Sequence, residues 1–518
     1  MISVAETRAP KSVPVAIWTG FAMMCIGMFM AILDVQVVAT SLPTIQRALN
    51  IAQDQMSWIQ TAYLIAEIIS IPLTGFLTRV LTMRWLFTVA VSFFTIASIG
   101  CAASDSFSSL IAWRVLQGFS GGTLIPSVFS AVFLLFPIRF QSLATVIAGV
   151  LAVLAPTLGP IVGGWITSTY SWPWLFLINV PPGIVAASMA SSFLPKDRPS
   201  FDRVRDLDII ALAFGAVALA TLEIAIKEAP KRGWSSPLAI DLLFLSLVTA
   251  VGFVAQTLRS RNPLVDLRTF GNRNFSIGCL LSFVLGMGLF GSVYLMPVFL
   301  AYVRERSALE IGEIMLVTGV AQLAAAPVAV VFVQRFDERP LIAAGFLVFA
   351  VGLGLSAVQT KATDFDEMFW PQLIRGWAIM FCILAPTQLA LGQLAKEAIA
   401  DASGLFNLMR NLGGAIGIAV IDTVIYSRAP EHARTLVDRL AAGDLDTMKT
   451  LGVSPDVVGL ALFDPEKRAM VAALVDKVAF VEATNDAWSL VAIATLTAIA
   501  IVPLARGSVR TGSVVLHG

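Results

Sequence analysis

Ionisable side chains stand inside long apolar stretches of this sequence, where burying a charge is costly. Asp34, Glu67 and Arg114 stand out in the first half of the chain. A buried carboxylate can bind and release a proton, because desolvation favours its neutral form and a nearby cation favours its ionised form. Arg114 does not readily lose its proton, so it needs a partner, and by depth it can meet Asp34 or Glu67. We hypothesise a charge pair that loosens when the carboxylate is protonated; the alternative is a static structural pair.

Glu67 belongs to a polar stripe that continues along one face of a predicted helix. Its members follow one another at steps of three and four residues: Gln60, Tyr63, Glu67, Ser70 and Thr74. Lipid cannot form hydrogen bonds with the polar side chains of such a face, so the face must line a cavity or meet another polar helix. Gln60, Tyr63 and Gln117, which lies one turn after Arg114, are therefore candidates for the lining of a substrate cavity.

The second half also carries ionisable residues within apolar stretches, namely Arg375, Arg410 and Asp422. Arg410 follows Asn407 in a polar patch that precedes a group of glycines. We count Arg375, Asn407 and Arg410 as further candidates for a substrate cavity, with structural and gating roles equally open. Glu223 lies near the outer end of a predicted span, where we expect it to be exposed at the surface.

Other chemistries find little support in the sequence. Each of the four cysteines lies in an apolar run, and their spacing matches no metal motif. The two histidines, His432 and His517, lie outside the predicted spans, and we find no phosphate-cradling loop. We therefore expect neither an enzyme nor a bound metal or cofactor.

The composition is that of a membrane protein. Of the 518 residues, 57% are hydrophobic and 13% are charged, about half the usual charged share of soluble domains, and the mean hydropathy is +0.83. The net charge is +1 and basic residues lie in short clusters, so we expect no nucleic-acid partner. The first apolar run continues beyond the place where a signal peptide would be cleaved, which indicates a retained helix.

We predict an all-α integral membrane protein with fourteen transmembrane helices, each about 20 residues or longer. The predicted spans are 15–38, 57–78, 84–103, 107–134, 142–168, 174–194, 207–227, 237–258, 274–300, 308–334, 340–358, 367–393, 403–427 and 485–505.

Basic residues in short loops favour a cytoplasmic N-terminus. With that orientation, alternate loops carry Arg79 and Arg84, Arg139, a cluster from Lys196 to Arg205, and another from Arg259 to Arg273. An even number of spans then places both termini in the cytoplasm. The long segment 428–483 falls outside the membrane, where its apolar positions could form one or two amphipathic helices that lie against the outer face.

The two halves of the chain form a weak repeat of six spans. Arg114 and Gly118 in the fourth span resemble Arg375 and Gly376 in the twelfth, and similar basic loops follow the second and tenth spans. Such repeats are typical of secondary transporters. The predicted division is a cytoplasmic N-terminus 1–14, a first bundle 15–194, two inserted helices with their cytoplasmic loops 195–273, a second bundle 274–505 that includes the long loop, and a cytoplasmic tail 506–518.

The fifth span combines close contact with an ability to bend. Gly159 and Gly163 form a small-residue face, and Gly164 follows it. Pro156 and Pro160 each remove a backbone hydrogen bond. The cluster predicts a helix that packs closely and flexes.

Five motifs, in order, resemble the major facilitator superfamily, and more narrowly its 14-span drug:proton antiporter branch typified by EmrB and QacA. Residues 33–43 keep the aspartate of the first motif as Asp34, with Gln36 and Ala39 in place of a threonine and an asparagine. In residues 75–84, Arg79 replaces the usual aspartate and Thr82 a glycine, so the usual charge latch is not carried over. Residues 114–122, 159–164 and 172–183 match well, and the likeness covers roughly residues 15–425.

The resemblance implies alternating access around a central cavity, with proton entry driving an amphipathic small molecule out across a bacterial inner membrane. It implies that Asp34 is the proton or cation site and Arg114 its relay partner, and that the proton gradient replaces any cofactor. Members from double-membraned bacteria work with a periplasmic adaptor and an outer-membrane channel. The motifs also indicate the residues that change conformation, which are Gly75, Arg79, Arg84, Gly118, Pro156, Gly159, Pro160, Gly163 and Gly164.

Several alternatives stay open at this point. The same fold could serve an importer, or an exporter of one specific metabolite such as a fatty acid, a siderophore-like compound or another organic anion. A channel or a membrane sensor is a different class, which the repeats and the glycine–proline helices disfavour. Asp34 and Glu67 suit cationic substrates, whereas Arg114, Arg375 and Arg410 suit anionic ones.

Overall fold

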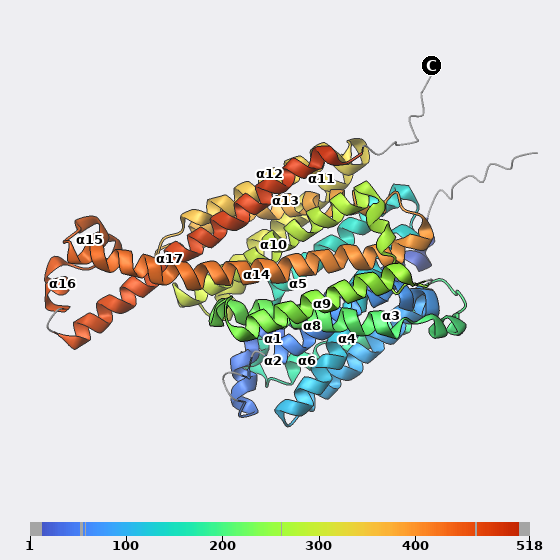
Figure 1. Cartoon of the computed structure of the whole chain (residues 1–518), viewed down its shortest axis with the longest axis horizontal. Helices are drawn as coiled ribbons and strands as arrows, with labels where there is room; N and C mark the ends of the chain where they lie inside the picture. Colours follow the sequence, from blue (N-terminus) through green and yellow to red (C-terminus); the bar gives the residue numbers. More distant parts are fainter. Residues whose placement is uncertain (1–12, 52–54, 57, 261, 462–463, 507–518) are drawn as a thin grey trace, which may run out of the picture.

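The computed structural model describes residues 13–51, 55–56, 58–260, 262–461 and 464–506, and within them every regular element is helical (Figure 1). The first half contains α1 (Val15–Ala48), α2 (Trp58–Ser70), α3 (Leu73–Ala102), α4 (Phe107–Leu135), α5 (Ile138–Thr169), α6 (Trp174–Leu177) and α7 (Val180–Phe193). The second half contains α10 (Arg273–Tyr302), α11 (Ala308–Arg335), α12 (Glu338–Leu355), α13 (Phe365–Leu391), α14 (Lys396–Ala441) and α17 (Pro465–Thr497), which continues as the 3-10 helix η4 (Ala498–Leu504).

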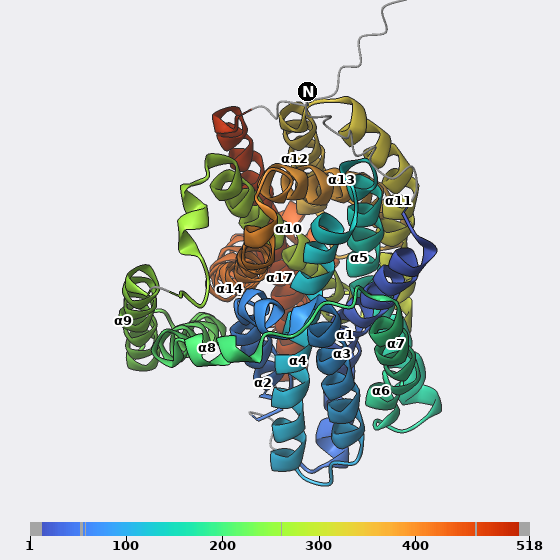
Figure 2. The same cartoon turned by 90° about the vertical axis from the view of Figure 1, so that its right-hand side faces the viewer.

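Between the halves, α8 (Ile209–Arg232) and α9 (Pro237–Arg259) form an antiparallel pair. This pair lies outside the two bundles, on one side of the molecule (Figure 2). Both helices are strongly apolar, and many of their large side chains are exposed, as expected for helices that face lipid. The prediction of two six-helix repeats with two inserted helices is confirmed.

Thirteen of the described helices are long and apolar enough to cross a membrane. A further crossing is formed by α2, which has 13 residues, and the start of α3. Thr82 within α3 has a φ of 70°, a left-handed conformation that interrupts the helix. Residues 73–81 therefore complete the crossing begun by α2, and the remainder of α3 returns, in agreement with the fourteen predicted spans.

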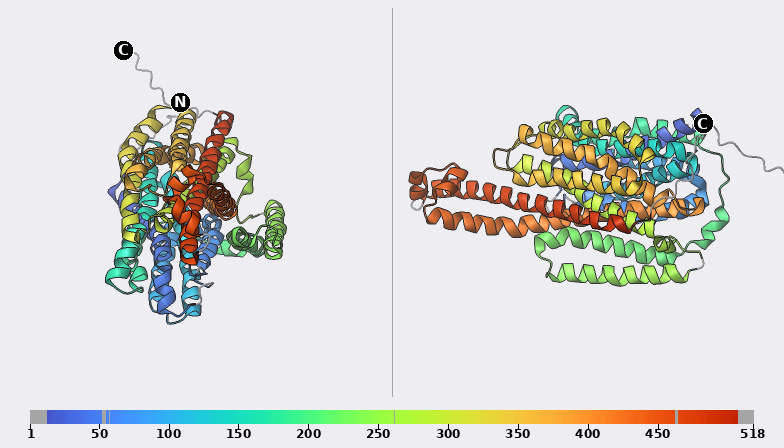
Figure 3. Two further views of the ribbon diagram at one scale, coloured as in Figure 1. Left: turned by 90° about the vertical axis from the view of Figure 1, so that its left-hand side faces the viewer. Right: turned by 90° about the horizontal axis from the view of Figure 1, so that it is seen from above.

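The molecule has two distinct ends. The described chain begins and finishes at one of them, which we call the terminus end (Figure 1). At the opposite end, α14 and α17 extend well beyond the other helices as an antiparallel pair, joined through α15 (Leu445–Leu451) and α16 (Pro455–Ala461) (Figure 3). We call this extension the hairpin, and the end that carries it the hairpin end.

The hairpin corrects the predicted arrangement of residues 428–483. We expected a loop with helices lying against the outer face, but α14 continues without a break to Ala441 and the helices project away from the bundle. They can do so because the hairpin has its own apolar core, made of Leu436, Leu440, Met448, Leu451, Val453, Val475, Val478 and Ala479. His432 also contacts Asp486 at 2.8 Å across the base of the pair.

The two halves meet along several surfaces. On one side, α5 packs against α11 so closely that a Cβ on Gly312 would overlap Ile161. At the terminus end α14 crosses α4, where the Ser403 hydroxyl donates to the Pro126 carbonyl at 2.9 Å. Nearer the hairpin end, α8 contacts both α2 and α14. The indole of Trp234, which follows the end of α8, donates to the Thr423 hydroxyl of α14 at 2.9 Å.

Glycines allow the helices of the first half to approach at the level of the backbone. A Cβ on Gly118 of α4 would overlap the carbonyl oxygen of Tyr63 in α2, and one on Gly159 of α5 would overlap Gln36 of α1. We therefore expect Gly118→Ala to force α2 and α4 apart at a cost of about 1–3 kcal/mol. The midpoint of thermal unfolding of the purified protein in detergent should fall.

Gly354→Ala is the matched control for this change. Its Cβ would make only an ordinary contact with Ala492, so the unfolding midpoint should stay the same. Equal midpoints for the Gly118 variant and the unaltered protein would contradict the close approach of α2 and α4.

Candidate functional site

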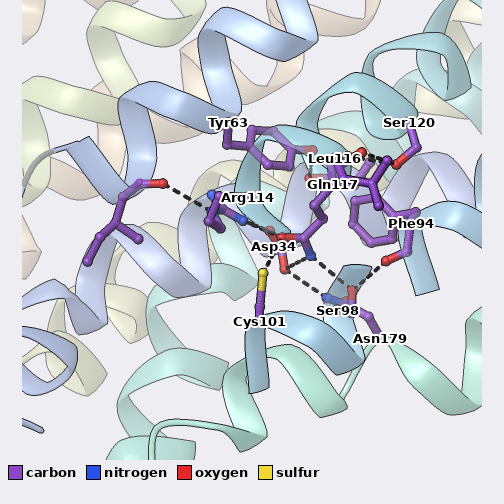
Figure 4. Close-up of polar contacts among 12 residues, drawn as sticks. Asp34, Tyr63, Phe94, Ser98, Cys101, Arg114, Leu116, Gln117, Ser120 and Asn179 are labelled. Carbon is purple, nitrogen blue, oxygen red and sulfur yellow. Dashed lines mark hydrogen bonds and ion pairs between the residues drawn. The ribbon is translucent and has the colours of Figure 1, made fainter. Parts of the chain in front are cut away.

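Asp34 lies at the centre of a buried polar network in the first half (Figure 4). Its carboxylate accepts hydrogen bonds from Arg114 Nη1 at 2.5 Å, from Gln117 Nε2 at 2.9 Å and from Asn179 Nδ2 at 2.8 Å. The side chains of Asp34 and Arg114 are both 0% exposed. The structure therefore brings together the two residues that the sequence predicted as a charge pair.

Arg114 is held on several sides. Its Nη1 also donates to Gln117 Oε1 at 2.7 Å, and its Nε donates to the Ile59 carbonyl of α2 at 3.1 Å. The guanidinium lies over the ring of Tyr63, 4.3 Å from its centroid, and the Tyr63 hydroxyl reaches the Ala31 carbonyl of α1. One group thus ties α4 to α1 and α2.

Asn179 and Ser98 complete the network, and the sequence did not assign them a role. Asn179 immediately precedes α7, and Pro181 and Pro182 lie in the first turn of that helix. Gln117 Nε2 donates to the Ser98 hydroxyl of α3 at 2.9 Å. Asn179 belongs to the matched segment 172–183, whereas the only sequence signal for Ser98 is an isolated serine in an apolar segment.

The energetics make this pair sensitive to protonation. Removing two charges from water is expensive, and their attraction repays the cost only when geometry and additional hydrogen bonds are good. Asp34 meets that condition with three donors, so its charge is well compensated while it is ionised. A proton on Asp34 would cancel the attraction and leave Arg114 as an uncompensated buried cation.

Glu67 stands apart from the network. Its carboxylate is half-buried and makes no hydrogen bond or ion pair within the described part of the chain. Within the polar stripe of α2, Tyr63 and Ser70 lie against α4, where Cβ atoms on Gly121 and Gly122 would overlap their hydroxyl oxygens. Thr61, beside the stripe, accepts a hydrogen bond from Lys227 of α8. Glu223, one turn earlier on α8, is also half-buried, so the prediction of a surface-exposed side chain is wrong.

The candidates of the second half lie away from Asp34 and occupy separate surroundings. The Arg375 guanidinium lies over the Trp488 ring, and that of Arg410 lies between Phe129 and Phe406. Asn407 Nδ2 donates to the Ser403 carbonyl one turn earlier in its own helix. Arg375 also borders a cavity between the two halves.

A second ion pair joins the halves at the terminus end. Arg79 Nη1 contacts the Asp401 carboxylate of α14 at 2.6 Å, and its Nη2 reaches the Leu264 carbonyl at 3.4 Å. Gly75 lies against Asp401, where a Cβ would overlap the carboxylate. Arg79 therefore forms a charge contact across the halves, although it replaces the usual aspartate of this loop. Arg84 lies nearby in sequence and contacts the Trp85 ring.

Charges at the hairpin end connect the α10–α11 loop to the start of α13. Arg304 and Arg306 contact the Asp364 carboxylate at 2.9 and 2.5 Å. Burial alone would raise the pKa of Asp364, but the hydrogen bonds and charges of the two arginines hold it below its usual value. Most of the residues that line a surface hollow at this cluster are charged, and all of them are far from Asp34 in the sequence.

Within the described residues, no group of three or more His, Cys, Asp or Glu side chains is arranged to hold a metal ion. The four cysteines are buried and free. The buried pair of Asp34 and Arg114 supplies a carboxylate that can bind a proton and a guanidinium that responds to its charge.

Comparison with known proteins identifies the family. The model of the Major Facilitator Superfamily matches residues 24–418. The chain is 39% identical over 420 residues to the colistin resistance protein EmrB of Acinetobacter baumannii, covering 81% of each chain. It is 33% identical to the multidrug export protein EmrB of Escherichia coli, over 79% of this chain and 80% of that one. The fatty acid resistance protein FarB of Neisseria gonorrhoeae is 31% identical, with coverage of 79% and 80%.

Solved structures share the fold at low sequence identity. The human organic anion transporter MFSD10 aligns with a TM-score of 0.60 and 15% identity, covering 95% of this chain and 100% of the other. The proton:xylose symporter XylE aligns with a TM-score of 0.56 and 14% identity, with coverage of 92% and 95%.

The buried pair predicts strong coupling between Asp34 and Arg114. Asp34→Asn alone leaves a buried cation without its counter-ion, a change that typically costs about 3–5 kcal/mol. Arg114→Met alone leaves a buried carboxylate. The double variant should lose much less stability than the sum of the two, as measured by thermal unfolding in detergent. Simple additivity of the two effects would show that the residues do not interact.

The ion pair at the terminus end predicts a conformational effect that can be read at a native thiol. Cys279 is buried in an apolar cluster that includes Ala402 of α14. Asp401→Asn removes the contact with Arg79, so we expect faster modification of Cys279 by a water-soluble maleimide, followed by mass spectrometry. Cys382, buried in the core of the second half, is the internal control. Unchanged modification of Cys279 would mean that this ion pair does not hold the end closed.

Proposed function

We propose that this chain, which belongs to the major facilitator superfamily, is a secondary active exporter that exchanges amphipathic drugs or toxic metabolites for protons by alternating access. The relatives named for multidrug export, colistin resistance and fatty acid resistance support export over import. The single observation that carries the proton coupling is the fully buried ion pair between Asp34 and Arg114.

In the proposed cycle, protonation of Asp34 releases Arg114 and loosens the contacts among α1, α3, α4 and α7. These helices are joined through Asp34, Arg114, Gln117, Ser98 and Asn179, so a change of charge at one atom reaches most of the first half. One proton that crosses 100 mV yields about 2.3 kcal/mol, and each pH unit adds about 1.4 kcal/mol. One or two protons per cycle would therefore support a substantial gradient of substrate.

The two halves would rock about the surfaces at which they meet. The pair of Arg79 and Asp401 joins the halves at the terminus end, and in the proposed cycle it would have to break when that end opens. We assign this end to the cytoplasm, because basic residues gather in the loops of that side, and we place the protein in a bacterial inner membrane. In that orientation the hairpin projects into the periplasm, on the side where an adaptor protein and an outer-membrane channel would stand (Figure 1).

The proposal predicts that Asp34→Asn abolishes proton-coupled export. In everted membrane vesicles energised by a proton gradient, the unaltered protein should accumulate ethidium, and ethidium should partly dissipate the gradient. The amide that replaces the Asp34 carboxyl cannot release a proton, so both signals should fall to those of vesicles without the protein. The matched control is Asp241→Asn, which alters an exposed carboxylate on the peripheral helix α9 and should leave both signals unchanged.

Two outcomes would contradict the assignment. Equal ethidium accumulation by the Asp34 variant would exclude this residue as the proton site and make Glu67 the next candidate. Accumulation that is independent of the proton gradient, by a folded and inserted protein, would exclude antiport altogether.

A further inference from the structure

A histidine joins the two long helices of the hairpin at its base, where they leave the bundle side by side (Figure 3). The Nδ1 atom of His432 in α14 lies 3.1 Å from Glu482 Oε2, and its Nε2 lies 2.8 Å from Asp486 Oδ2. Both carboxylates belong to α17 and are four positions apart, so they project from one face of that helix. The imidazole is 24% exposed, so these contacts are largely shielded from water.

This geometry asks both ring nitrogens to donate. An ionised carboxylate only accepts hydrogen bonds, and a neutral imidazole carries a single N–H. In the neutral form, one ring nitrogen of His432 would therefore turn its lone pair toward a carboxylate. The imidazolium donates at both nitrogens and places a positive charge between two negative ones. Protonated His432 satisfies both contacts, whereas neutral His432 satisfies one.

The surrounding charges favour the protonated ring. Arg428, one turn before His432 on α14, contacts Glu431 at 2.7 Å and Asp486 at 3.3 Å. The cluster thus holds three carboxylates, from Glu431, Glu482 and Asp486, against one guanidinium until the ring adds a second positive charge. Within the described residues, no ion pair from an element other than α14 and α17 reaches this cluster.

Charges from other elements act elsewhere on the same two helices. Lys231 of α8 acts on Asp422, which lies nearer the membrane on α14. Glu305, in the loop after α10, contacts Lys477 of α17 at 2.8 Å. The Lys477 pair is exposed on the Glu305 side, so it contributes little to the position of the hairpin. The cluster around His432 is therefore the main charged link between α14 and α17.

This link joins two helices that are anchored to different neighbours. The side chain of Asn485 in α17 exchanges two hydrogen bonds with the Gln359 backbone, at 3.0 and 2.8 Å, which fixes α17 to the loop after α12. α14 contacts α4 and α8 and carries Asp401, the partner of Arg79 at the terminus end. The charge on His432 therefore decides whether α14 is tied to α17 at the hairpin end.

We propose that His432 is a proton-sensitive strap, which ties α14 to α17 at the base of the hairpin when it is protonated and releases Glu482 when it is neutral. Histidine ordinarily changes charge between about pH 5 and 8. Since both contacts exist only while the ring is protonated, the stability that they add is present at acidic pH and is lost as the pH rises. In the orientation proposed above, His432 faces the periplasm, so the hairpin stiffens as the outside becomes acidic. This inference goes beyond the proposed function, because it depends on neither the substrate nor Asp34.

The test is amide hydrogen exchange of the purified protein in detergent, measured by mass spectrometry at about pH 5.5 and about pH 8. Exchange rates are divided by the intrinsic rates at each pH, so that only the opening of the helices is compared. Peptides from the base of the hairpin, residues 428–440 and 475–486, should be about three to ten times better protected at the acidic pH. Peptides of α9, which has no histidine, should be equally protected at both.

Two substitutions at His432 separate its charge from its bulk. His432→Gln removes the titrating ring, so the base of the hairpin should be weakly protected at both pH values. His432→Arg supplies a permanent cation next to the same carboxylates, so the base should stay protected at both. Arg434→Gln alters an exposed charge on the same helix and is the control, which should behave like the unaltered protein.

Equal protection of the base at the two pH values in the unaltered protein would overturn the proposal. A pH dependence that persists in folded His432→Gln would also overturn it. If His432→Gln does not fold, Glu482→Gln decides the question, because it removes one of the two carboxylates and keeps the contact of His432 with Asp486. The difference in protection between the two pH values should then shrink, and an unchanged difference would reject the strap.

Discussion

The first half of the structure depends on one constraint, which is that a charge in the hydrocarbon core is costly unless the protein compensates it. Asp34 and Arg114 satisfy each other, and the hydrogen-bond capacity that remains recruits Gln117, Asn179 and the Ile59 carbonyl. Each of these partners comes from α2, α4 or the start of α7. The hydrogen bonds of a single ion pair therefore fix several helices relative to one another. The same interaction that orders the first half also makes it responsive to a proton, because the attraction exists only while Asp34 is ionised.

Such a network needs helices that approach more closely than side chains normally allow. Gly118 and Gly122 bring α4 against the backbone of α2, and Gly159 brings α5 against α1. The hydrophobic effect contributes little to the association of helices in lipid, so close van der Waals contacts and hydrogen bonds between helices must supply the stability. Closely packed glycine faces can also slide, and Pro156 and Pro160 within α5 leave backbone carbonyls without their usual partners. Tight contact and mobility thus arise from the same residues.

The sequence was sufficient to predict the spans and to name Asp34 and Glu67 as the candidate partners of Arg114, because hydropathy and the cost of a lone charge are local properties. It was insufficient where the answer depends on which helices become neighbours. The stripe of Gln60 to Thr74 predicted a cavity or a polar neighbour, yet only the fold shows that Tyr63 and Ser70 of this stripe lie against α4. Asn179 was visible as part of a motif, but its hydrogen bond to Asp34 spans 145 positions of the chain. The prediction for residues 428–483 was wrong, because an amphipathic pattern does not distinguish a helix that lies on the membrane surface from one that packs against a second helix.

The two halves share a helical plan but differ in how they compensate charge. Arg114 lies 2.5 Å from the Asp34 carboxylate, so its charge is compensated only while Asp34 is ionised. Arg375 lies over Trp488 and beside Met296, and no carboxylate of the described residues pairs with it. Since α5 borders the cavity beside Arg375 and also packs against α1, the helix that carries Asp34, a shift of α5 would alter the surroundings of both helices.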